Sequence, residues 1–170
     1  MVKGLFAKGA ILWAALVLAG CGTATSPIPT AVASTPLQAL PLTPEQRAGS
    51  VSFQMNTAVD ALSQATTKSE SLRTSLGAKA PKDLDKLDSL LYSAGETIGD
   101  YPNNPPTGKK GPDLKAWMDK ASSAATTSLE QLQQAESLAT GLDKDDSLAG
   151  SIRVSEDALR GAIQSSSSVN

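Results

Sequence analysis

The chain has 170 residues with 15 basic and 17 acidic side chains, no histidine and a single cysteine. The missing histidine excludes a Ser-His-Asp triad, a histidine general base and an imidazole metal ligand. The slight acidity argues against nucleic acid as a partner, because binding a phosphate backbone requires clustered lysine and arginine.

The first 20 residues have the order of a signal peptide. Lys3 and Lys8 give a positive start, and residues 10–17 form a short apolar run. This run is too short for a membrane span, which needs roughly 20 apolar residues, but it suits the core of a signal peptide. Small residues precede Cys21, so we predict cleavage between Gly20 and Cys21.

The run Leu18-Ala19-Gly20-Cys21 resembles the lipobox of bacterial lipoproteins. The resemblance implies that Cys21 carries a diacylglycerol and a further acyl chain such as palmitate. It also implies an extracytoplasmic domain anchored in the lipid of the cell envelope, and Gly22 favours the outer membrane if the organism has one. The alternatives are a lone cysteine buried as a small side chain, a secretory signal cut elsewhere and an uncleaved membrane anchor.

Residues 21–42 predict a lipidated N-terminus and a tether. Loss of residues 1–20 removes two lysines and no acid, which leaves 13 basic and 17 acidic residues. The tether is rich in Ser, Thr and Ala, and its four prolines disfavour a helix. At about 3.1 Å per residue, an extended tether reaches up to roughly 60 Å from the lipid.

A long first helix is predicted over residues 44–76. Thr43 is placed as the N-cap, Pro44 suits the first helical position and Gln46 can complete a capping box. Apolar or small residues then recur at alternating spacings of four and three up to Leu76, and Gly77 ends the helix. Such a seam packs within one chain or pairs between chains, so a homo-oligomer is an alternative.

The same start, Leu42-Thr43-Pro44-Glu45-Gln46, resembles the Leu-Thr-x-x-Gln motif of small helical periplasmic chaperones of the Spy type. The sequence has no second copy of the motif. The resemblance implies a helical holdase that cradles unfolded clients. Helix capping alone also accounts for these residues.

Three further helices are predicted. The second covers 82–99 and opens with acids that complement the helix dipole. The third covers 113–140, where Gly141 ends it, and the fourth covers 145–165 from Asp145 and Asp146. The proline-rich stretch 99–112 is predicted to be a loop. Residues 43–168 therefore predict an all-α antiparallel bundle of four helices, in which the first and third helices are the longest.

The segments 84–90 and 142–148 agree at six of seven positions, which is compatible with a duplicated helical hairpin or with chance similarity. The chemistry of the chain points away from catalysis, and we expect a non-enzymatic protein without metal or cofactor. Asp143, Asp145 and Asp146 lack the glycine and the glutamate of a calcium loop and fit a helix start better. Ser69 and Ser128 lie on apolar seams, where we expect their hydroxyls to bond back to their own helices.

The best candidate site for a partner is the long loop and the aromatic side chains beside it. Loops of this length are often functional, and Trp is frequent at the centre of protein interfaces. The candidate partner-binding face consists of Tyr101, Lys109, Lys110 and Trp117. For Trp117 itself we expect core packing, and an exposed anchor on a partner surface is the alternative that this face requires. The expected function is a lipid-anchored bundle that binds an envelope protein, and a Spy-type holdase is the alternative.

Overall fold

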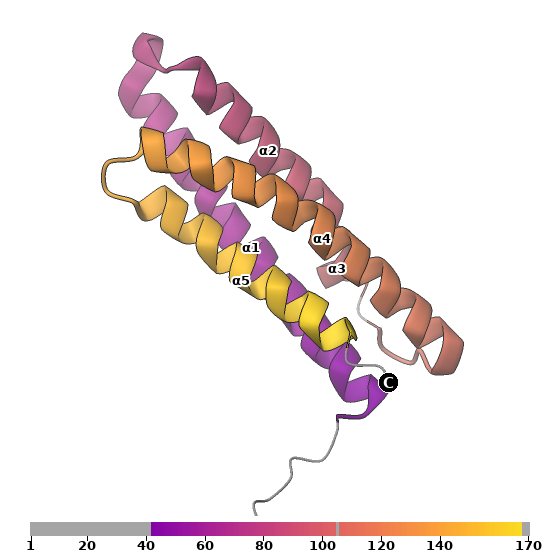
Figure 1. Cartoon of the computed structure of the whole chain (residues 1–170). Coiled ribbons are helices and arrows are strands. Elements are labelled where there is room, and N and C mark those ends of the chain that lie inside the picture. The colour runs from indigo at the N-terminus through magenta and orange to yellow at the C-terminus, as the bar shows by residue number, and fades with distance from the viewer. Residues whose placement is uncertain (1–41, 105, 168–170) are drawn as a thin grey trace, which may run out of the picture. The chain divides into compact units, whose positions relative to one another are not determined.

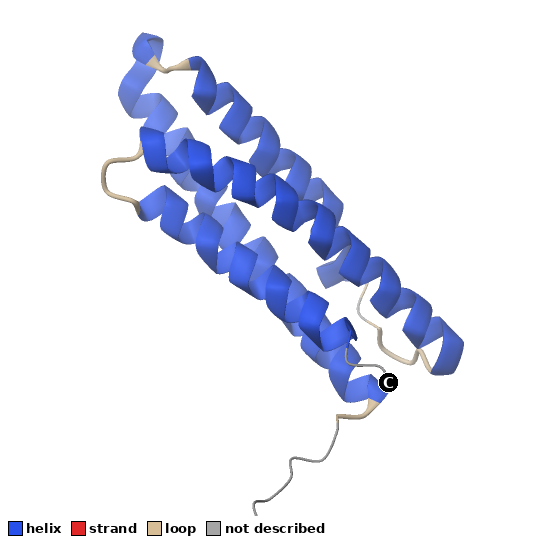
Figure 2. Cartoon of the chain, in the orientation of Figure 1, coloured by secondary structure: helices blue, strands red, loops and turns tan. Residues whose placement is uncertain are grey.

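The computed structural model describes residues 42–104 and 106–167. Cys21, the predicted signal peptide and nearly all of the predicted tether lie outside them. Within these residues the chain is helical and has no strand (Figure 2). The helices in order are α1 (Pro44–Leu76), the short 3₁₀ turn η1 (Gly77–Lys79), α2 (Lys82–Ile98), α3 (Asp100–Asn103), α4 (Gly111–Leu142) and α5 (Ser147–Ser167).

The four long helices form the predicted all-α bundle, in which they run side by side (Figure 1). Helix α1 packs most extensively on α5, and α4 lies between α5 and α2. The contact between α1 and α2 is the smallest among these neighbouring pairs. The bundle is therefore most open along its α1–α2 edge.

Helix α1 begins and ends where the sequence predicts. The Thr43 hydroxyl accepts the Gln46 backbone N–H at 3.2 Å, and the Gln46 side chain accepts the Thr43 N–H at 2.9 Å. This capping box satisfies N–H groups that the first turn leaves without a partner. At the other end Gly77 has φ 54°, a backbone conformation that favours glycine.

The long helices differ in length, as predicted, and this difference shapes one end of the bundle. Helices α1 and α4 have 33 and 32 residues, whereas α2 has 17. Because α2 starts beside the C-terminus of α1 and runs antiparallel to it, α2 ends beside the middle of α1. The first half of α1 therefore lacks α2 as a neighbour, and α3 contacts α1 there instead.

Several predicted boundaries are wrong. The stretch 99–112 is not all loop, because it contains α3 and the start of α4. Gly141 does not end α4, since Leu142 continues the helix and packs against the core. Asp145 and Asp146 precede α5 in a turn, where Asp146 has φ 54°. Helix α5 runs on to Ser167, where the Ser167 hydroxyl donates to the Ile163 carbonyl at 2.8 Å.

The core is built from small residues and leucines, and it also contains serines. The expectation that seam serines bond within their own helix is wrong. Ser128 in α4 donates to the Ala94 carbonyl of α2 at 3.1 Å, and Ser69 in α1 donates to Asp88 of α2. At these sites a small side chain lies where two helices approach closely. The hydroxyl therefore donates to an acceptor on the neighbouring helix and not to a carbonyl of its own helix.

Candidate functional site

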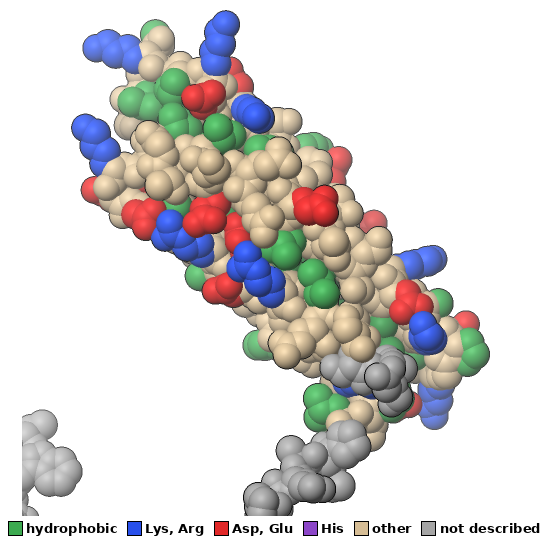
Figure 3. All heavy atoms as spheres, viewed as in Figure 1, with side chains coloured by type: hydrophobic (Ala, Val, Ile, Leu, Met, Phe, Trp, Pro, Cys, Tyr) green, Lys and Arg blue, Asp and Glu red, His purple; other side chains and the backbone are tan. Residues whose placement is uncertain are grey.

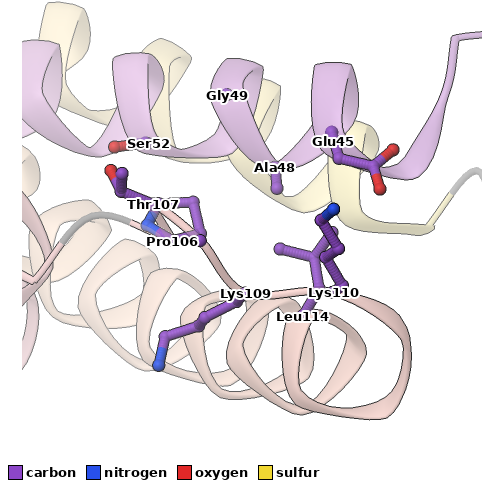
Figure 4. A pocket seen from close by; sticks show the side chains of 10 residues that line it. Glu45, Ala48, Gly49, Ser52, Pro106, Thr107, Lys109, Lys110 and Leu114 are labelled. Atoms are coloured by element: carbon purple, nitrogen blue, oxygen red, sulfur yellow. The ribbon is translucent and has the colours of Figure 1, made fainter.

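A pocket of about 410 Å³ lies where α2 is missing beside α1. Its walls are the first turns of α1, the loop before α4 and the first turn of α4 (Figure 4). The loop is positioned by the aromatic residues described below, and its Gly108 has φ 77°. The lining residues are Glu45, Ala48, Gly49, Ser52, Pro106, Thr107, Gly108, Lys109, Lys110 and Leu114.

The floor of this pocket is apolar and its rim is charged. Ala48 and Leu114 belong to the buried core, at 1% and 2% exposure. In Figure 4 the Lys110 side chain reaches toward α1 beside Glu45, whereas Lys109 extends away from α1. Neither lysine side chain forms an ion pair or hydrogen bond with any residue that the structure describes. The rim thus carries two basic groups and one acidic group.

The two predicted aromatic residues support the loop instead of facing outward. Trp117 is 8% exposed, so its expected core packing is confirmed and the alternative of an exposed anchor is wrong. Its indole N–H donates to the Asn104 carbonyl at 3.1 Å. The Tyr101 ring stacks edge-on against it with centroids 6.0 Å apart, and burial raises the pKa of the Tyr101 phenol. The structure therefore brings Lys109 and Lys110 to the pocket and places the aromatic pair behind the loop.

A second hollow of about 350 Å³ follows the open edge between α1 and α2. Val59, Leu62 and Leu91 contribute its apolar surface, and Gly95 faces Leu62 across it. Tyr92 is exposed at its margin, where a hydrogen bond from its hydroxyl to Glu96 raises the pKa of the phenol. This hollow has no charged group apart from Glu96 among its lining residues.

Sequence reasoning missed a lysine–serine pair, because its members lie far apart along the chain. Lys68 of α1 donates to the Ser151 hydroxyl at 2.6 Å and to the Ser147 carbonyl at 2.8 Å. The Ser151 hydroxyl also donates to that carbonyl, at 3.3 Å. A base that activated this serine would need a lone pair directed at the hydroxyl, whereas Lys68 acts here as a donor to both groups. The pair therefore ties α1 to the start of α5.

The acids between α4 and α5 also have a structural role. The Asp143 carboxylate accepts the backbone N–H groups of Leu148 and Asp145, at 2.8 Å and 3.2 Å. The bond from the Leu148 N–H is the main cause that lowers the pKa of Asp143. Across the described residues, no cluster of three or more acidic or other metal-binding side chains is placed to hold a metal ion.

Comparisons with protein-family models, with curated proteins and with solved structures find no match. Among the described helices, none has the length and apolar character needed to span a membrane. On the face shown in Figure 3, basic and acidic side chains are interspersed and form no extended patch of one sign. The pocket beside the Lys109–Lys110 loop is therefore the candidate site that geometry and sequence share.

Proposed function

We propose that this chain is a bacterial envelope lipoprotein whose helical bundle binds another envelope component without catalysing a reaction. The observation that carries the proposal is the sequence around Cys21, in which charge, apolar core, small residues and cysteine follow in the order of a lipobox. The lipid holds the protein at the membrane, and the tether sets how far the bundle reaches.

The binding site in this proposal is the end of the bundle formed by α1, the loop and the start of α4. Its support is the pocket, whose lining carries two lysines and one acid, whereas acidic and basic side chains are interspersed on the face shown in Figure 3. The Thr43–Gln46 pair acts as a helix cap in this structure, which gives the Spy-like residues a local role. We therefore place a specific adaptor before a general holdase.

Photo-crosslinking in intact cells tests this proposal. A crosslinkable residue at the exposed Thr107 should capture one specific protein, and the same probe at the exposed Ser137 of α4 should not. The double variant K109E/K110E should abolish the product. The control K79E/K82E makes the same charge change at the opposite end of the bundle and should leave the product intact. Many unrelated products at Thr107 would favour the holdase. The absence of any crosslinked product at Thr107 would refute the proposed site.

A further inference from the structure

The pocket beside the Lys109–Lys110 loop has the features of a small-molecule site. Its volume of about 410 Å³ falls in the range of about 300–1,000 Å³ that is typical of ligand pockets. It exists because α2 ends early, so no long helix lies over this side of α1 and α4. Ala48 and Leu114 line its floor with only 1% and 2% of their surface exposed, so Gly49, Pro106 and the lysine stems contribute the rest of its apolar lining.

The floor of the pocket suits an alkyl chain better than a peptide. Ser52 and Thr107 contribute the only uncharged polar side chains among the lining residues. A peptide that entered the pocket would bury backbone N–H and C=O groups with few partners, which is costly. An alkyl chain has no such groups and gains from every methylene that leaves water.

The rim of the pocket favours a negatively charged head group. Lys110 reaches toward α1 at the rim, whereas Lys109 lies on the loop with its side chain directed away from α1 (Figure 4). Neither lysine side chain has a partner among the described residues, and Glu45 is the one acid among the lining residues. Helix α4 begins at Gly111 without a side-chain cap, but Asp113 in its first turn already complements the positive end of the dipole, so the preference for an anion rests on the lysines. A head group at the rim stays in water while its chain occupies the floor.

We infer that this pocket binds a single-chain anionic amphiphile of the fatty-acid class, with the alkyl chain between α1 and α4 and the head group beside Lys110. This ligand goes beyond the proposed protein adaptor, although both lie at the same end of the bundle: the ligand occupies the pocket itself, and the adaptor would contact the exposed loop beside it. The two ideas fail separately, since the ligand is tested on the purified protein and the adaptor in cells.

Dodecanoate is the probe, and dodecyltrimethylammonium is its control with the same chain and the opposite charge. Each amphiphile is titrated, at concentrations below those at which it forms micelles, into purified protein. The protein begins at residue 21 and carries the substitution Cys21→Ser. Trp117 is the only tryptophan in that chain and is bonded to the start of the loop, so its fluorescence reports on the pocket. We expect saturable binding of dodecanoate at least about fivefold tighter than that of the cation, as expected for exposed charge pairs.

Two variants locate the binding. Gly49 lines the pocket, and a Cβ added there meets no atom within 4 Å. The Gly49→Phe variant should therefore fold without a steric clash at Cβ, and its ring should block the binding of dodecanoate. Gly141→Phe is the matched control, at an exposed glycine of α4 with equally open surroundings, and should bind as the parent does. Glu45→Gln should tighten binding by removing the only acid of the rim.

Any of four results overturns the inference. The first is no saturable binding of dodecanoate. The second is equal binding of the cation, which would remove the role of the lysines. The third is undiminished binding by a folded Gly49→Phe variant, which would place the ligand elsewhere. Binding to phosphatidylglycerol vesicles without binding of monomeric dodecanoate would also overturn it, in favour of a membrane surface.

Discussion

At the scale of single residues, buried serines connect the helices of this bundle. Ser155 of α5 donates to the Ala58 carbonyl of α1 at 2.9 Å, and Ser128 of α4 donates to α2 in the same way. Both are fully buried. Each hydroxyl lies where a larger side chain would separate the helices, so the small residue and its hydrogen bond act together.

Removal of either hydroxyl should weaken the fold. We expect Ser128→Ala and Ser155→Ala each to lower the free energy of unfolding by about 1 kcal/mol, the usual net value of a buried hydrogen bond. Because the two serines connect different helix pairs, the double variant should lose the sum to within about 0.5 kcal/mol. Urea denaturation measures this, with Ser137→Ala as the exposed helical control. If the free energy of unfolding falls no further in both variants than in the Ser137→Ala control, these bonds do not stabilise the bundle.

Asp143 should make stability depend on pH in the acidic range. Its pKa is lowered in the folded protein, chiefly by the Leu148 N–H. The folded state therefore favours the charged form, and the stabilisation is complete above the ordinary Asp pKa of about 3.9 and is lost as the pH falls toward the lower folded value. Asn keeps an accepting oxygen but loses the charge, so we expect Asp143→Asn to lower the free energy of unfolding at pH 7 and to cost progressively less below about pH 4. Thermal unfolding from pH 7 to pH 3 tests this, and a gap that stays constant with pH would contradict it.

At the scale of helices, the sequence predicts what local chemistry determines. The capping box and Gly77 define both ends of α1, and both were predictable from residue type and spacing. The start of α5 was not, since it depends on the Asp143 carboxylate accepting N–H groups several residues ahead. Similarly, α3 was not predicted, and its Tyr101 packs against Trp117, which lies in a later helix.

The suspected hairpin repeat fails at the same scale. Residues 84–90 are helical in α2, whereas residues 142–148 leave α4, form a turn and enter α5. Equivalent hairpins would place equivalent residues in the same conformation. The match between the two segments therefore reflects shared composition and not a shared structural position.

Replacing a glycine by alanine at the ends of two helices should change the free energy of unfolding in opposite directions. Gly77→Ala should lower the free energy of unfolding by about 1–2 kcal/mol, because φ 54° is strained for a residue with a Cβ. Gly141→Ala should raise it by about 0.5 kcal/mol, since Gly141 is helical, exposed and in open space. Chemical denaturation of both variants checks this. Equal effects would contradict the assigned backbone conformations.

At the scale of the whole molecule, the unequal helix lengths determine where a ligand or partner can enter. The sequence predicts that α1 and α4 are the longest helices, but the pocket follows from which helix lies beside which, and that requires the three-dimensional pairing. The loop lysines were predicted as site residues from loop length alone. The core packing expected for Trp117 is confirmed, whereas the alternative of an exposed anchor is wrong because the indole packs in the core behind the loop.

The apolar seam of α1 is used within the chain. Val51, Met55, Ala58 and Leu62 are all buried in the bundle. Pairing between chains would therefore need other surfaces, such as those around the exposed Phe53 and Tyr92. The homo-oligomer stays a prediction that rests on those residues and no longer on the seam.

The central claim is that this bundle is held at a membrane by lipid on Cys21, and mass spectrometry of the protein purified from membranes tests it most directly. We predict an N-terminus at Cys21 whose mass includes a diacylglycerol, and a Cys21→Ser variant that carries no lipid and leaves the membrane fraction. An unmodified Cys21, an N-terminus elsewhere, or a Cys21→Ser protein that still carries lipid would contradict the claim.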